Sequence, residues 1–180
     1  MNPENFRDAL AREFRRRVLE ESLSRIGRCL DELTDEDLWL RPNEASNSVG
    51  NLLLHLAGNV RQWIVSGLGG APDRRDRPAE FAARGPVPRA DLRRDLETAV
   101  RRAVEVVERL PAAALFEPRT VQGFTETGLS ILVHVIEHFS YHTGQIVYFT
   151  KARKAIDLGF YRGVDLTRRN SGPPAPPPRA

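Results

Sequence analysis

Four histidines are the residues of this sequence best suited to chemistry. His55 lies in one apolar segment, and His134, His138 and His142 follow one another at four-residue intervals in another. Because side chains four residues apart stack on one face of a helix, either His134 with His138 or His138 with His142 could chelate one divalent ion. The full triplet fits poorly, since each step of four drifts by about 40° around the helix. A third imidazole ligand would have to be His55.

The alternative is that these histidines are ordinary core residues. A single histidine on an apolar face, such as His55 taken alone, usually has its ring nitrogens hydrogen-bonded within the protein. Stacked rings without partners would each cost about 1–3 kcal/mol in a core, and a shared metal removes that cost. The spacing alone leaves both interpretations open.

A short zinc-protease string is also present. His134-Val-Ile-Glu137-His138 matches H-x-x-E-H, in which the glutamate is a general base. Those enzymes take a third ligand from another helix downstream, whereas the only downstream imidazole here, His142, lies on the same segment. We therefore assign no protease. Glu137 is kept as a candidate catalytic base, although its side chain points about 100° away from that of His138, and an arginine partner explains it equally well.

Four amphipathic helices must position these residues. Apolar residues recur at helical spacing over four ranges, 3–33, 48–67, 90–110 and 128–153. Ser46 or Ser48 is the predicted cap of the second helix, and Thr34 with Asp37 predicts a short helical turn over 35–40. No strand pattern competes with these helices.

The connections and the chain ends follow from composition. The segments 69–90 and 111–127 are long enough to be crossovers rather than tight turns. We expect one domain over 1–165 and a Pro-rich, disordered tail over 166–180, which contains five prolines in Asn170 to Ala180.

Charge and cysteine usage exclude several classes of protein. The chain has 180 residues, 41% of them hydrophobic and 28% charged, which suits a single globular core. Its net charge of +3 comes from arginines scattered among 24 acids, so we predict no nucleic-acid partner. No apolar run approaches the roughly 18 residues of a membrane span, and no apolar signal core is apparent. With the single cysteine Cys29, this predicts a cytoplasmic protein without a membrane partner.

Two segments resemble the DinB/YfiT-like superfamily of bacterial four-helix metal-binding proteins. They are Ser48-Val-Gly-Asn-Leu-Leu-Leu-His55-Leu-Ala-Gly-Asn59 and His134-Val-Ile-Glu-His138-Phe-Ser-Tyr-His142-Thr-Gly-Gln145-Ile. The resemblance spans about 6–154 and implies an all-α four-helix bundle, up-down-down-up with two long crossovers. It also implies a metal triad of His55, His138 and His142, which settles the pair that spacing left open.

The resemblance also bears on chemistry. Three neutral imidazoles would leave a divalent ion, zinc or nickel before iron, with an open coordination position, as in catalytic zinc sites. Such an ion lowers the pKa of a bound water or thiol. Superfamily members are often metal-dependent transferases of low-molecular-weight thiols, others look like hydrolases, and dimers are frequent.

We therefore expect a metal-dependent enzyme, a transferase of a small thiol before a hydrolase, assembled as a homodimer. The alternative is a non-catalytic metal-binding or stress-associated module, and a cavity that reaches the metal would favour the enzyme. His134, Asn59 and Gln145 are the candidates for orienting the ligands or lining the pocket. Capping or helix packing explains Asn59 and Gln145 equally well.

Overall fold

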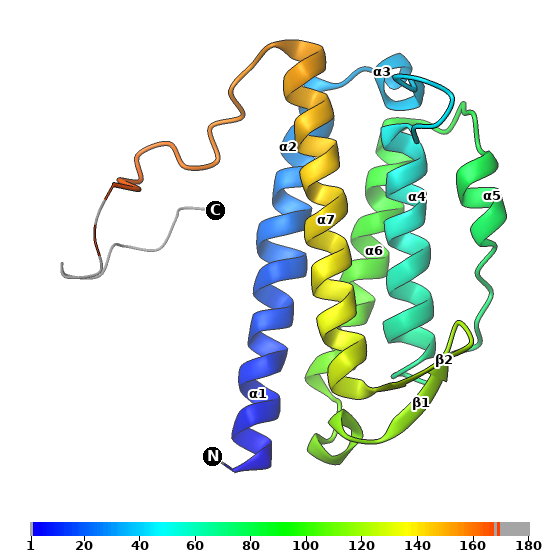
Figure 1. Cartoon of the computed structure of the whole chain (residues 1–180), viewed down its shortest axis with the longest axis vertical. Coiled ribbons are helices and arrows are strands. Elements are labelled where there is room, and N and C mark those ends of the chain that lie inside the picture. Colours follow the sequence, from blue (N-terminus) through cyan, green and yellow to red (C-terminus); the bar gives the residue numbers. More distant parts are fainter. Residues whose placement is uncertain (1, 168, 170–180) are drawn as a thin grey trace.

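The computed structural model of the chain describes residues 2–167 and 169; most of the predicted tail, 170–180, lies outside them. Four long helices form the expected up-down-down-up bundle (Figure 1). They are α1 (Pro3–Phe14) continued by η1 (Arg15–Leu23) and α2 (Ser24–Glu32), α4 (Val49–Val60) continued by η2 (Arg61–Ser66), α6 (Arg89–Glu108), and α7 (Gly128–Lys154).

The predicted helix starts are confirmed. The Thr34 side chain accepts from the backbone N–H of Asp37, and the Asp37 carboxylate accepts from that of Thr34, which opens α3 (Asp35–Trp39) with a capping box. A second capping box opens α4, and its cap is Ser48 rather than Ser46. These caps set where each helix begins and therefore which of its residues face the core.

Packing places α4 beside α7. Each of these helices also contacts one further long helix, α6 in the case of α4 and α2 in the case of α7. The core between the four long helices consists of fully buried apolar side chains, among them Phe14, Ile26, Leu30, Leu53, Leu56, Leu96, Ile131 and Phe139. In the described part of the chain, no helix is both long and apolar enough to cross a bilayer.

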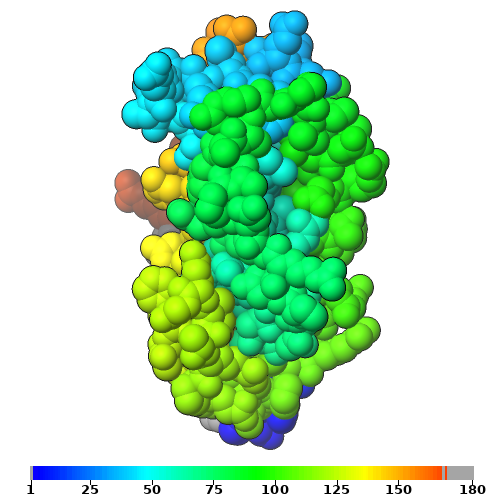
Figure 2. Space-filling view, turned by 90° about the vertical axis from the view of Figure 1, so that its right-hand side faces the viewer, coloured from blue at the N-terminus to red at the C-terminus, as the bar shows by residue number. Residues whose placement is uncertain are grey.

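The first long connection contains a helix that the sequence analysis did not predict. This helix, α5 (Arg77–Ala82), begins at Asp76, whose side chain accepts from the Ala79 N–H, and carries Pro78 in its first turn. It packs along α4. Figure 2 looks onto this crossover, which lies across the outer side of the molecule in front of α4. The connection is therefore an ordered strap.

The second long connection contains a two-stranded β-hairpin, whereas the sequence analysis predicted no strands. After a 3-10 turn, η3 (Ala112–Leu115), the strands β1 (Pro118–Val121) and β2 (Phe124–Thr127) pair antiparallel. The two turn residues, Gln122 and Gly123, have φ of 53° and 83°, as a two-residue hairpin turn requires. Neither strand alternates apolar and polar residues, since their sequences are Pro-Arg-Thr-Val and Phe-Thr-Glu-Thr, so the Gln-Gly pair between them was the signal that the sequence offered.

The end of α7 is tied to α3 by one buried carboxylate. The side chain of Asp37 is 3% exposed and lies 2.7 Å from Arg153 Nε and 2.5 Å from Lys154 Nζ. The hydrogen bonds from Lys154 and Arg153, with a smaller contribution from Thr34, outweigh burial and hold the pKa of Asp37 far below its ordinary value. Ionised Asp37 therefore stabilises the junction of the two helices.

Replacing Asp37 by Asn should lower the free energy of unfolding at neutral pH by about 2 kcal/mol, because two charge-assisted hydrogen bonds are lost. Since the folded-state pKa is lowered, this stabilisation is complete above the unfolded-state pKa of about 4 and is lost as pH falls below it toward the folded-state value. Urea unfolding of both proteins from about pH 7 down to about pH 3 measures this, and the difference should shrink. Glu36→Gln, an exposed acid of the same short helix, should change little. A pH-independent difference for Asp37→Asn would contradict the assignment.

Candidate metal centre

The imidazoles of His55, His138 and His142 meet between α4 and α7. His55 Nε2 lies 3.0 Å from His138 Nε2, and His142 Nε2 lies 3.2 Å from the same atom. One nitrogen from each ring lies within 4.8 Å of the other two. Of the two histidine pairs that spacing allowed on the last helix, the structure thus brings His138 and His142, without His134, to His55.

The outer nitrogens of two of these rings face hydrogen-bond acceptors. His55 Nδ1 lies 3.0 Å from Glu80 Oε2, and His142 Nδ1 lies 2.7 Å from Gln145 Oε1. A neutral imidazole that donates through Nδ1 has an unprotonated Nε2. Two lone pairs therefore point at His138 Nε2, which can offer at most one proton. A cation among the three nitrogens removes this conflict.

The spacing of the nitrogens fits a divalent ion. With metal–nitrogen bonds of about 2.0–2.1 Å in tetrahedral geometry, two ligand nitrogens lie about 3.3–3.4 Å apart, close to the 3.0 and 3.2 Å found here. Burial, and then the neighbouring imidazoles of His142 and His55, lower the pKa of His138 to about 3. Burial also lowers the pKa of His142. Both rings are therefore neutral at pH 7, the form in which imidazole binds metal, so the cluster could hold one ion.

A buried ion pair from the crossover orients His55. The Glu80 side chain is 9% exposed, and its two oxygens accept from Arg75 Nε at 2.7 Å and from Arg75 Nη2 at 2.9 Å. Arg75 Nη2 also lies 3.0 Å from His55 Nδ1, because both donors converge on the same carboxylate oxygen. Burial alone would raise the pKa of Glu80, but its bonds with Arg75 and His55 lower it. Glu80 is therefore an ionised acceptor for the Nδ1–H of His55.

The sequence analysis missed Glu80 and Arg75. Both lie in the segment that was predicted only as a connection, 20 and 25 residues after His55. Asp76 followed by Pro78 is a helix-start signal that could have revealed α5. Nothing in the local pattern distinguishes Glu80 from the other acids of this segment.

The remaining candidate residues are dispersed around the cluster. Gln145 contacts it through His142, as described above. His134 stacks instead on Trp63, with ring centroids 4.0 Å apart, and its buried Nε2 has no hydrogen-bond partner among the described residues. Asn59 is 2% exposed, and its Oδ1 likewise has no partner in the described part of the chain. Glu137 is exposed and lines a cavity of 420 Å³ together with Trp63 and His134.

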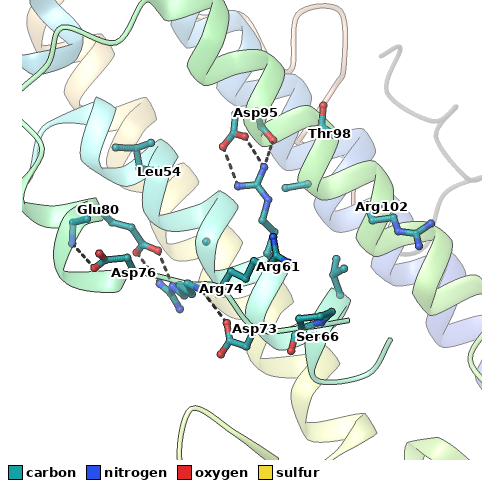
Figure 3. Close-up of a pocket in the computed structure, with 16 residues that line it drawn as sticks. Leu54, Arg61, Ser66, Asp73, Arg74, Asp76, Glu80, Asp95, Thr98 and Arg102 are labelled. Atoms are coloured by element: carbon teal, nitrogen blue, oxygen red, sulfur yellow. Dashed lines mark hydrogen bonds and ion pairs between the residues drawn. The ribbon is translucent and has the colours of Figure 1, made fainter. Parts of the chain in front are cut away.

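Two further cavities adjoin the residues around the cluster. One of 690 Å³ is lined by Gln145 and the C-terminal half of α7. The other, of 530 Å³, lies between α4, α6 and the crossover, and Glu80 forms part of its wall (Figure 3). Arg75 also lines it. In that cavity Arg61 binds both carboxylate oxygens of Asp95, so its charged side chains are largely engaged with one another.

Comparison with known proteins identifies relatives of this fold. The family model of the mycothiol-S-transferases matches residues 16–157. The crystal structure of a DinB-like protein from Bacillus cereus ATCC 10987 superposes with a TM-score of 0.59 at 18% sequence identity, covering 73% of this chain and 85% of that one. This likeness confirms the DinB-like fold. No curated protein matches the chain.

The fit of Glu80 against α4 can be tested at Gly58. A Cβ atom at Gly58 would overlap Glu80 Oε1, whereas a Cβ atom at Gly144 of α7 would meet nothing within 4 Å. Gly144→Ala should therefore stabilise the protein by up to about 1 kcal/mol through helix propensity, and Gly58→Ala should destabilise it by about 1–3 kcal/mol through overpacking. Urea unfolding of the two variants measures both. An equal gain in both would show that Glu80 is not held against this helix.

Proposed function

The chain belongs to the mycothiol-S-transferase family, and on this premise we propose that it is a divalent-metal-dependent transferase that joins a low-molecular-weight thiol to an electrophilic carbon of a second substrate. The observation that carries the proposal is the convergence of three imidazole nitrogens whose lone pairs cannot all be compensated by one proton. The family match supports a thiol of the mycothiol type as the substrate class.

The residues of the chain have separate tasks in this reaction. His55, His138 and His142 would hold the ion, which when bound supplies a Lewis acid that lowers the pKa of a thiol. Glu80 and Gln145 keep the Nδ1 protons of His55 and His142 in place, so that their Nε2 lone pairs stay directed at one point. Glu137 carries no step of this proposal.

The overall transfer balances without a further reactant. The sulfur–hydrogen bond of the thiol breaks, a sulfur–carbon bond forms at the acceptor, the bond from that carbon to its departing group breaks, and the departing group takes the electron pair of that bond and the proton. Because three protein ligands leave at least one coordination position open, the centre has room for the thiol. Zinc or nickel suits this imidazole set before iron.

The surroundings of the cluster favour an enzyme over a non-catalytic module. A structural zinc site is closed by four protein ligands, whereas three histidines converge here. Gln145 and His134, which lie about one helical turn from the ligands His142 and His138, line cavities of 690 and 420 Å³ beside the cluster. Cavities of this size are typical of small-molecule sites. A hydrolase would need the same open position, and the family match favours the thiol over water.

Metal stoichiometry tests the ligand assignment. His138→Ala should abolish binding of one ion per chain, because His138 Nε2 is the atom that both other rings approach. His134→Ala, which removes the neighbouring half-buried ring one turn earlier on the same helix, should retain the ion. Elemental analysis after zinc loading and desalting measures both variants. Equal loss in the two would mean that the site includes His134, and full retention in both would exclude a histidine site.

Thiol transfer tests the reaction. The zinc-loaded protein should accelerate the reaction of mycothiol with the electrophile monobromobimane at least about tenfold over the metal-free protein, because coordination increases the fraction of thiolate. The fluorescent product reports the rate. His138→Ala should react no faster than the metal-free protein. A loaded protein that binds zinc yet gives the uncatalysed rate with several electrophiles would favour the non-catalytic module.

A further inference from the structure

An apolar groove follows the C-terminal half of α7. It is the cavity of 690 Å³ that lies between α7 and the segment joining α3 to α4. Its floor includes Val49 and Leu52, which are 1% and 7% exposed. Phe149 and Ala152 of α7 also line it. This volume is within the roughly 300–1,000 Å³ of small-molecule sites, and an apolar lining with few polar groups is typical of them.

One end of the groove adjoins the metal centre. Gln145 lines the groove and also accepts the hydrogen bond from His142 Nδ1 at 2.7 Å. Leu52 of the floor precedes His55 by three residues, so the two side chains are neighbours on the α4 surface. A molecule in the groove would therefore have one end close to the candidate metal centre.

The other end carries a positive charge. Arg153 lines it, and its side chain is half exposed while its Nε binds Asp37. Lys154 binds the second oxygen of the same carboxylate. Two cations thus share one anion, which leaves a net charge of one at this end. A partly exposed guanidinium there suits a carboxylate or another planar anion.

The rim of the groove exposes large apolar side chains. Tyr148 is 77% exposed and Leu40 is 41% exposed. A flat apolar ligand would cover such a rim and remove its surface from water. Gln145 and Arg153 are eight residues apart, which corresponds to roughly 12 Å along a helix. The groove therefore fits an elongated molecule of about that length.

The cavity of Figure 3 lacks these properties. Its lining pairs acids with bases, as in Arg61 with Asp95 (Figure 3) and Arg75 with Glu80. The Arg75–Glu80 pair also lies between this cavity and His55, since both residues line the cavity and contact the ring. A ligand there would have to disrupt these pairs before it approached the cluster.

We propose that the groove beside Gln145 binds the acceptor substrate of the transfer reaction, and that this acceptor is an elongated, largely apolar molecule with an anionic end. The anion lies at Arg153, and the electrophilic carbon lies at the Gln145 end, where the thiol sulfur would meet it. The role of this ligand as an acceptor substrate rests on the proposed function. The groove and the chemistry of its ligand rest only on the lining residues and their contacts.

The experiment uses 8-anilinonaphthalene-1-sulfonate, an aromatic anion whose fluorescence rises in apolar surroundings, with the full metal-free chain. Ala152→Trp fills the groove from an exposed position, and Ala90→Trp places the same side chain at an exposed position of α6 that lines none of the described cavities. The wild type should bind one probe per chain, Ala152→Trp should bind it at least about tenfold more weakly, and Ala90→Trp should match the wild type.

The uncharged analogue N-phenyl-1-naphthylamine tests the charged end, because a substitution of Arg153 would also release Asp37. It should bind at least about fivefold more weakly than the sulfonate. Equal affinity for the two probes, or equal sulfonate binding by both Trp variants, overturns the proposal. Light scattering could instead show that the wild type is a dimer and that Ala152→Trp is a monomer, with no probe bound to either protein. This result would overturn the proposal and would mean that a second copy of the chain occupies the groove.

Loading with Co²⁺ separates this inference from the proposed function. If the groove adjoins the centre, bound cobalt should quench the emission of the bound sulfonate probe, and His138→Ala, which lacks the metal, should show no quenching. Cobalt that binds without quenching overturns the position of the groove. Failure of any metal to bind refutes the proposed function, whereas the titrations of the metal-free chain still decide whether the groove takes an apolar anion.

Discussion

Three imidazole nitrogens face one another, and one shared proton cannot compensate the lone pairs of all three. This constraint determines how the helices and the crossover around the rings must be arranged. Glu80 and Gln145 accept the outer protons of His55 and His142, so the inner nitrogens are acceptors. His138 lies between them with a strongly lowered pKa. The three rings come from two helices, so α4 and α7 must be neighbours in a fixed register.

The crossover between α4 and α6 contributes directly to this arrangement. A buried ion pair is costly because both charges lose water, and it persists where every charged atom finds a partner. Glu80 meets that condition through Arg75 and His55, and Gln62 accepts from Arg75 Nη1 at 2.9 Å. Gly58 leaves the space that the carboxylate occupies. The long connection thus acts as a strap that fixes the orientation of one ligand ring.

The surroundings of the three rings are strongly asymmetric. Toward Gln145 lies an apolar groove that ends at Arg153. Toward His134 lies a stack of aromatic rings, in which Trp63 packs on His134 and the indole N–H donates to Gln122 of the hairpin at 3.1 Å. The proposed transfer would need two approaches to one centre, one for each substrate, and these different walls would allow each approach to select a different molecule.

The sequence by itself determined the four helices, the capping box of Thr34 with Asp37, and the placement of His134, His138 and His142 one turn apart on a single helix, because each depends on neighbours within a few residues of the chain. It could not choose between the two histidine pairs of α7, since both have identical helical spacing; apart from the family resemblance, that choice depends on how α4 packs against α7. The sequence alone also could not predict the contact of Glu80 with His55 or the presence of the β-hairpin. Which acid of a crossover meets His55 depends on the path of the strap across α4, a non-local outcome of packing that leaves no periodic signal in the chain.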